Sequence, residues 1–182
     1  MTGLSGASDG LLAQRAGDGD AVAFGVLARR YGSYLVAFAT RLTGSRADAE
    51  DCVQEALITA WDQLHTLEDS DRVRSWLSTI VSRKAVDRIR ARRPVVPIDD
   101  VEFPAAPADT PERRAVASSQ IAALEQVLGG LPDEQRAVWV LKEIGEHSYE
   151  EIAEQLGVTP STVRGRLARA RRAVLEQMEE WR

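Results

Sequence analysis

The chain has 182 residues, of which 44% are apolar and 28% charged, and its formal net charge is -5. The apolar share is large enough to fill the cores of one or two globular domains, which excludes a disordered polar chain. The negative net charge excludes a uniformly basic surface, so any nucleic-acid site must lie where basic residues are concentrated.

The first part of the chain shows helical periodicity in three segments. Between residues 20 and 42, apolar residues recur every three or four positions, and Asp18 or Asp20 can cap the start. This spacing predicts one helix or a bent pair of helices. After a glycine-serine break, the same periodicity predicts a helix over residues 48–64 and another over residues 73–93.

Proline marks the middle of the chain. Five of the seven prolines fall within one short acidic stretch, and proline fixes φ and lacks a backbone donor. We therefore predict a flexible linker over 95–111 between a domain at 9–94 and a domain at 112–182. Strand-like alternation is absent, so the predicted fold class is all-α: two small helical domains, the second containing a helix-turn-helix. Helices are predicted in the second domain over residues 112–128, 132–144, 149–156 and 160–180.

The segment 149–163 has the features of a helix-turn-helix. Ala153 is small where two helices cross, and Gly157 follows four residues later, where the turn requires a positive φ. Thr159 can cap the second helix and Pro160 can begin it, which leaves the amino-terminal surface of that helix exposed. These features predict a module that places its second helix in the major groove of DNA.

Positive charge is concentrated on this second helix. Residues 158–175 include five arginines and no acid, although the chain as a whole is acidic. A solvated basic face is the alternative, but the preceding helix and turn favour DNA binding. Side chains on the first turn can reach base edges, whereas later arginines meet phosphates. The candidate base contacts are Ser161, Thr162 and Arg164, and the candidate phosphate contacts are Arg166, Arg169 and Arg172.

Charge in the first domain changes sign between neighbouring segments. Residues 48–71 hold eight acids and no lysine or arginine, whereas residues 72–93 hold eight basic residues and one acid, Asp87. Such a division suits a domain that binds a protein partner on one side and nucleic acid on the other. Trp76 offers a stacking face for an unpaired base, but its place in an apolar stripe favours a core position.

These segments resemble the extracytoplasmic-function (ECF) sigma factors of the sigma-70 family. Residues 46–55 (RADAEDCVQE), Trp61, residues 73–80 (VRSWLSTI) and residues 85–93 (AVDRIRARR) look like the family's second region. The segment 131–172, which begins LPDEQR, looks like its fourth region. The two blocks follow the family's order and cover the chain except for the linker and both ends. The joint match is more specific than the helix-turn-helix alone.

The resemblance implies a transcription initiation factor that directs the RNA polymerase core to specific promoters. The first domain would bind the polymerase clamp and assist melting of the -10 element, and the second would read the -35 element. The expected partners are the polymerase core, promoter DNA and an anti-sigma factor. The residues that match the clamp-binding positions are Asp48, Asp51, Gln54 and Glu55. Those that match the -10 positions are Arg83, Lys84, Arg88, Arg90 and Arg92, and those that match the -35 positions are Ser161, Thr162, Arg164, Arg166 and Arg169.

The chain departs from the family pattern at two of these segments. Gly165 stands where many relatives carry a hydroxyl residue, which removes one candidate DNA contact. Cys52 occupies a position that is usually aliphatic, so we expect it to be a small buried apolar group rather than a redox sensor.

Two other classes of function, a conventional regulator and an enzyme, predict different features. A conventional regulator with a dimerising first domain would bind its operator tightly without polymerase. An enzyme would need a nucleophile with its base, or a glycine-rich phosphate loop, and the sequence offers neither. The two histidines are too far apart for a local metal motif, so no cofactor and no metal are expected. The single cysteine and the lack of an export signal or membrane span predict a cytoplasmic protein.

Overall fold

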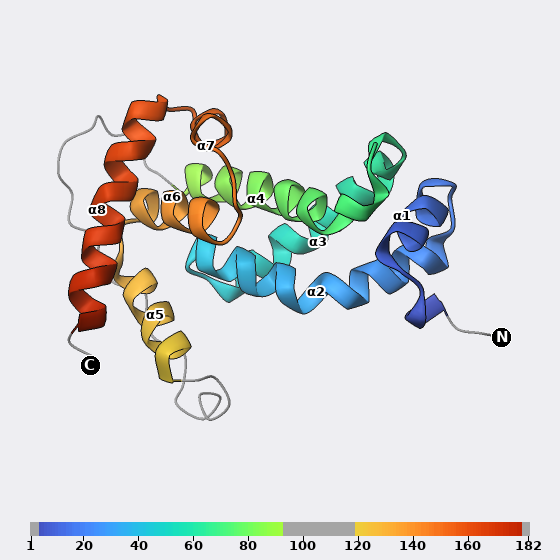
Figure 1. The fold of residues 1–182 in the computed structure, drawn as a ribbon, viewed down its shortest axis with the longest axis horizontal. Helices are drawn as coiled ribbons and strands as arrows, with labels where there is room; N and C mark the ends of the chain where they lie inside the picture. Colours follow the sequence, from blue (N-terminus) through green and yellow to red (C-terminus); the bar gives the residue numbers. More distant parts are fainter. Residues whose placement is uncertain (1–3, 93–118, 180–182) are drawn as a thin grey trace. The chain divides into compact units, whose positions relative to one another are not determined.

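The computed structural model describes residues 4–92 and 119–179. Every regular element in these two ranges is a helix (Figure 1), which confirms the predicted all-α class. The predicted linker at 95–111 lies outside the described residues, as does the start of the helix predicted from residue 112. Contacts divide the chain into two compact units, Met1–Thr40 with Ser45–Arg88, and Arg41–Gly44 with Ile89–Arg182.

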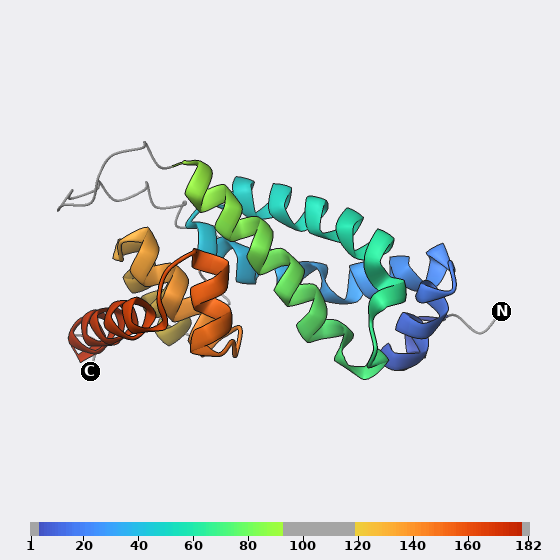
Figure 2. The ribbon, with the colours of Figure 1, turned by 90° about the horizontal axis from the view of Figure 1, so that it is seen from above.

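Helices α1 to α4 build most of the first part of the chain, and Figures 1 and 2 show their arrangement. Asp20 caps the start of α2, because its carboxylate accepts hydrogen bonds from the backbone N–H groups of Val22 and Ala23. The helix then continues without a break, so it is a single helix and not a bent pair. Helix α3 starts earlier than predicted because Ser45 caps it. The elements are η1 (Leu4–Gly6), α1 (Asp9–Gly17), α2 (Ala21–Thr43), α3 (Arg46–Gln63), η2 (Leu64–Thr66), η3 (Ser70–Arg72) and α4 (Val73–Ala91).

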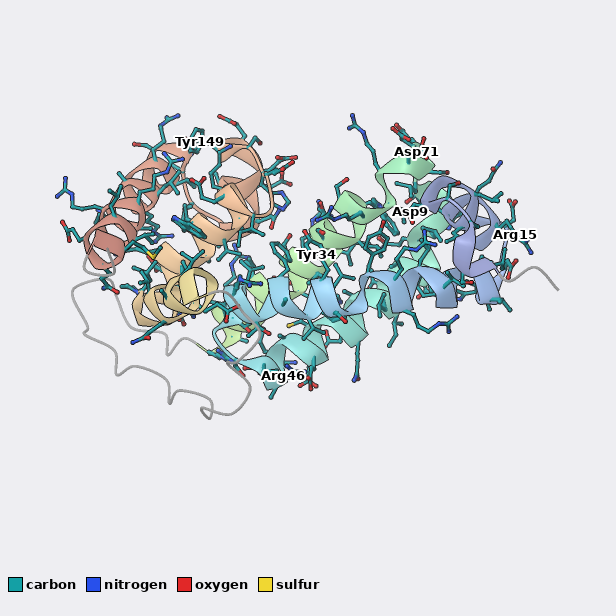
Figure 3. All side chains as sticks on the ribbon, turned by 60° about the horizontal axis from the view of Figure 1, so that its bottom comes forward. Asp9, Arg15, Tyr34, Arg46, Asp71 and Tyr149 are labelled. Atoms are coloured by element: carbon teal, nitrogen blue, oxygen red, sulfur yellow. The ribbon has the colours of Figure 1, made fainter. Side chains whose placement is uncertain are left out.

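Helix α1 was not predicted from the periodicity. Ser8 caps this helix, and Leu12 is buried on one side of it. Further hydrogen bonds to its first residue, Asp9, come from α2. Tyr31 donates to Asp9, and Arg30 pairs with the same carboxylate. Burial would raise the pKa of Asp9, but the hydrogen bonds from Tyr31 and Arg30 outweigh it and lower the pKa. Burial and the neighbouring carboxylate raise the pKa of Tyr31 to about 12. Figure 3 shows Asp9 near Asp71, where α1 packs against η3.

The described residues 119–179 form four helices, and three of them pack around the longest, α8. The helices are α5 (Ser119–Gly130), α6 (Asp133–Glu143), α7 (Tyr149–Leu156) and α8 (Pro160–Glu179). Helix α8 contacts α5, α6 and α7. Its buried side, which includes Val163, Leu167 and Ala170, faces that core. These apolar residues recur every three or four positions, so they share one side of α8, and the opposite side remains exposed to solvent.

The turn between α7 and α8 has the predicted geometry. Gly157 adopts a left-handed conformation with φ of 64°, and its N–H bonds back to the carbonyls of Ala153 and Glu154. Ala153 is buried beneath the turn. The hydroxyl of Thr159 accepts the backbone N–H of Thr162 at 3.2 Å, so Thr159 caps α8 as expected. These local bonds fix the direction in which α8 leaves the turn.

A capping box fixes the other end of α7. The Ser148 hydroxyl accepts the N–H of Glu151 at 3.2 Å, and the Glu151 carboxylate accepts the N–H of Ser148 at 2.7 Å. The hydrogen bonds from the Ser148 backbone and hydroxyl lower the pKa of Glu151 from its ordinary value of 4.5. The Glu151 half of the box therefore stabilises the folded helix when its carboxyl is ionised.

We expect Ser148→Ala to lower the local stability of α7 by about 1 kcal/mol, because an orphan N–H loses its acceptor. Amide hydrogen exchange of α7 measures this change.

The stability of α7 should also depend on pH through Glu151. Because the folded-state pKa of Glu151 is depressed, its contribution to the stability of α7 is present above pH 4.5 and is lost as the pH falls through that lower pKa. Glu150→Gln removes an acid from the same turn outside the box, so it should keep the pH dependence that Glu151→Gln removes. Equal pH profiles for these two variants would contradict the assignment.

Candidate functional site

The first candidate surface lies along α3. Asp48, Asp51 and Glu55 follow one another at spacings of three and four residues, so they share one face of the helix, and Gln54 lies beside it. Asp51, Gln54 and Glu55 are exposed, and Asp48 is half-buried. The sequence prediction missed Ile58, which follows Glu55 by three residues and is 67% exposed. An exposed apolar side chain beside carboxylates extends this face and suits a protein partner.

The second candidate surface lies on α4, and the structure divides its basic residues between different faces. Lys84 and Arg88 are four residues apart and lean toward α3, where both contact carboxylates. Arg83 and Arg90 are exposed and lie on another side of the helix. Arg92, at the end of the described range, donates to the carbonyl of Thr43 at 3.0 Å. The five predicted -10 residues thus do not form one basic surface.

Ion pairs join α3 to the part of α4 that belongs to the first unit. The guanidinium of Arg88 lies 3.8 Å from Asp48, 3.6 Å from Asp51 and 3.6 Å from Glu55. The ammonium of Lys84 lies 3.9 Å from the second oxygen of Glu55. The acids that the sequence assigns to a protein partner and two of the bases that it assigns to DNA are therefore partners of each other.

The third candidate surface is the start of α8. Ser161 and Arg164 are exposed on its first turns, and Arg169 is exposed further along. Thr162 is half-buried, and its hydroxyl lies 3.0 Å from that of Thr159. Exposed hydroxyl and guanidinium groups at the start of a helix in a helix-turn-helix match the chemistry of base edges and phosphates.

Two other arginines of α8 are bound to α6. Arg166 forms an ion pair with Glu134, and only 14% of its side chain is exposed. Arg171 donates from Nε at 2.9 Å and from Nη2 at 2.6 Å to one oxygen of Glu143, which raises the pKa of Arg171. These pairs tie α8 to the helix beneath it. Arg166 is therefore less accessible to DNA than Arg164 or Arg169.

An aromatic ring that the sequence prediction did not include lies beside the candidate base contacts. Tyr149, at the start of α7 (Figure 3), has the guanidinium of Arg164 5.8 Å from its ring centroid and the ammonium of Lys142 5.0 Å from it. Cation–π contacts at such distances restrict a flexible cationic side chain. The ring supports Arg164 from α7, and only the turn geometry brings these two residues together.

Cys52, Trp61 and Trp76 differ in burial. Cys52 is 2% exposed, and burial raises the pKa of its thiol, which confirms the expected small buried group. Trp76 is half-buried. Trp61 packs edge-to-face on Phe24 with ring centroids 5.2 Å apart, and 38% of it stays exposed. In the described ranges, no helix has the length and apolar character needed to span a membrane.

Comparison with known proteins matches both parts of the chain. Residues 27–95 match the family Sigma-70 region 2, and residues 121–174 match the family Sigma-70, region 4. The chain is 33% identical over 168 residues to the RNA polymerase sigma factor NccH of Alcaligenes xylosoxydans xylosoxydans, covering 90% of each chain. It is 35% identical over 155 residues to the ECF RNA polymerase sigma factor SigM of Mycobacterium tuberculosis, covering 84% of this chain and 76% of SigM.

Solved structures give the same match at the level of the fold. The structure of CnrH in complex with the cytosolic domain of CnrY superposes with a TM-score of 0.57 at 31% identity, covering 94% of this chain and 97% of CnrH. The sigma factor RpoE of Bartonella quintana, solved with the anti-sigma factor NepR, gives a TM-score of 0.57 at 26% identity, covering 86% of this chain and 96% of RpoE. The two regions, the whole-chain relatives and the helical fold agree, and the chain belongs to the ECF sigma factors of the sigma-70 family, promoter-specific transcription initiation factors of RNA polymerase.

Proposed function

We propose that the two parts of the chain divide promoter recognition between them. The part at 9–94 binds the polymerase core and the -10 element and assists its melting, and the part at 112–182 reads the -35 element. The exposed start of α8 supports the second role most directly, because Ser161 and Arg164 stand on a capped helix that a fixed turn positions. The chain acts in the cytoplasm as a non-catalytic subunit of polymerase.

Within the part at 9–94, we assign polymerase binding to the exposed acidic face of α3. Asp51 and Glu55 present carboxylates that pair with arginines of a basic partner, and Gln54 adds an amide. Asp48 supports this face from a half-buried position. The -10 DNA contacts are assigned to α4, where Arg83 and Arg90 are the more exposed residues.

Within the part at 112–182, Arg164 reads bases and Arg169 binds phosphate. Arg166 contributes less to DNA binding than these two residues, because its ion pair with Glu134 competes with a phosphate contact. An anti-sigma factor is a further proposed partner, since RpoE, which is similar in fold and sequence, was solved with the anti-sigma factor NepR.

A transcription assay tests the proposed function. Purified chain added to the polymerase core should give promoter-selective transcripts on genomic templates, whereas the chain alone should bind the same promoters weakly. Mapping the transcript starts then reveals the promoter sequence. Tight, symmetric operator binding by the chain alone, with no selective transcript when the core is added, would refute this function.

Charge reversal on α3 tests the polymerase face. Glu55→Lys should weaken binding to the polymerase core about tenfold or more, because a charge pair at a protein interface becomes a repulsion. Glu50→Lys makes the same change of charge on another side of α3, where Glu50 pairs with Arg46 at 2.8 Å. A competition assay against a labelled sigma factor measures both. Similar losses for the two variants would show that the effect is long-range charge and not this face.

A further inference from the structure

Arg88 occupies an unusual electrostatic position in the first unit. Its single guanidinium lies within 4.0 Å of the carboxylates of Asp48, Asp51 and Glu55, which follow one another along α3. Lys84, one turn earlier on α4, adds a second positive charge at Glu55. Arg88 is thus the one cation among the described residues of α4 that spans the whole acidic face.

These contacts are loose enough to exchange. Their lengths of 3.6 to 3.8 Å exceed those of direct N–H···O hydrogen bonds, and 33% of the Arg88 side chain is exposed. Each such pair contributes little by itself in water. Three carboxylates together nevertheless hold the guanidinium close to α3, and their negative charge repels any phosphate that approaches it.

A basic partner competes with Arg88 for the acidic face, because Arg88 faces Asp51 Oδ2 and Glu55 Oε1 and a bidentate arginine would use the same oxygens. Once those oxygens are taken, Arg88 keeps only half-buried Asp48, at 3.8 Å, among these three counter-charges, while it remains on the helix assigned to DNA. Arg83 differs, because it is exposed on another side of α4.

We propose that Arg88 is an exchangeable counterion that couples the two binding surfaces of the first unit. In the free chain it neutralises the acidic face of α3, and when the polymerase core takes these carboxylates it moves to a DNA phosphate. Polymerase binding then strengthens DNA binding, and by linkage DNA binding strengthens polymerase binding by the same factor. The inference rests on the proposed function of α3 as the polymerase face.

Alanine substitutions measured in two states test the exchange. The probe is a short fluorescent duplex carrying a promoter mapped by the transcription assay. In the complex with the polymerase core, Arg88→Ala should weaken binding about 3- to 10-fold and reduce the salt slope by about 0.9, the loss of one phosphate contact. In the free chain the same variant should change DNA affinity less than about twofold. Arg83→Ala, the matched control, should weaken both states.

Two outcomes of this comparison would overturn the proposal. Equal weakening of the free chain and of the complex by Arg88→Ala would mean that Arg88 already contacts DNA without polymerase. No weakening in either state would mean that Arg88 only packs α4 against α3. Thermal unfolding of the variant, followed by circular dichroism, separates both outcomes from a loss of folding.

Neutralising the acids gives an independent readout in the free chain. Asp51→Asn/Glu55→Gln should bind DNA about 3- to 10-fold more tightly than Glu50→Gln/Glu68→Gln, although each pair of substitutions removes two negative charges. The difference should shrink when Arg88→Ala is added to both. A difference of the same size in the Arg88→Ala background would contradict the role of Arg88.

The same variants separate this proposal from the proposed function. If Asp51→Asn/Glu55→Gln keeps wild-type affinity for the polymerase core, α3 is not the polymerase face. If core binding falls as expected but Arg88→Ala affects the free chain and the complex alike, the polymerase face stands and the exchange fails.

Discussion

An Arg164→Ala variant is expected to lose about 5- to 150-fold of its preference for the correct upstream promoter element, the range that one specific base contact confers. Arg164 is exposed on the first turns of α8, and the ring of Tyr149 limits its freedom. Transcription from a mapped promoter is compared with transcription from the same promoter with its -35 element scrambled. The ratio should fall in the variant, while affinity for the polymerase core stays unchanged.

Arg169→Ala is the matched control for this prediction. Arg169 is exposed further along the same helix, where a phosphate contact adds affinity without sequence preference. This variant should weaken both templates evenly and lower the salt slope by about 0.9. If Arg164→Ala also reduced both templates evenly, Arg164 would be a phosphate contact and the assignment of base readout would be wrong.

Leu167→Ala is expected to have the largest effect on stability, about 2 to 5 kcal/mol of unfolding free energy. Leu167 is 2% exposed on the face of α8 that packs against the other helices of its unit. Its truncation leaves a cavity where α8 is held and should release the recognition helix. Amide hydrogen exchange of α6 and α8 measures the loss.

The control for Leu167→Ala is the same substitution about two turns further along the helix. Leu175 is 61% exposed, so Leu175→Ala should change stability by less than about 0.5 kcal/mol. Protection of amides in α3 should be unchanged by either variant, because that helix lies in the other compact unit and has its own buried residues. A small effect of Leu167→Ala would mean that α8 is held by its ion pairs with α6 and not by its apolar face.

The helix-turn-helix was predictable because its signals are local. Ala153, Gly157 and Thr159 act on neighbours within four residues, and the structure gives each the expected role. Helix α1 has one local signal, the Ser8 cap, but its other support is not local. Its start is held by Tyr31, 22 positions from Asp9, and no short window of sequence contains both residues.

The candidate sites also combine features that are visible in the local sequence with features that depend on tertiary packing. The sequence identifies the arginines of α8 and the acids of α3, because composition and spacing of three and four residues are visible in one segment. It does not distinguish Arg164, which is exposed, from Arg166, which is paired with Glu134 more than thirty positions earlier. Accessibility depends on which helix packs beneath each side chain.

By itself, the sequence of this sigma factor determined the all-α class, the helix-turn-helix and the separation of acidic and basic segments in the first part of the chain. Helical periodicity, capping and turn chemistry are short-range effects, so they are written in neighbouring residues. Only the tertiary structure decided that Arg88 faces three acids of α3 while Arg83 is exposed on another side of α4. The reason is geometric, because the packing of α3 against α4 selects which of the basic side chains meets the carboxylates.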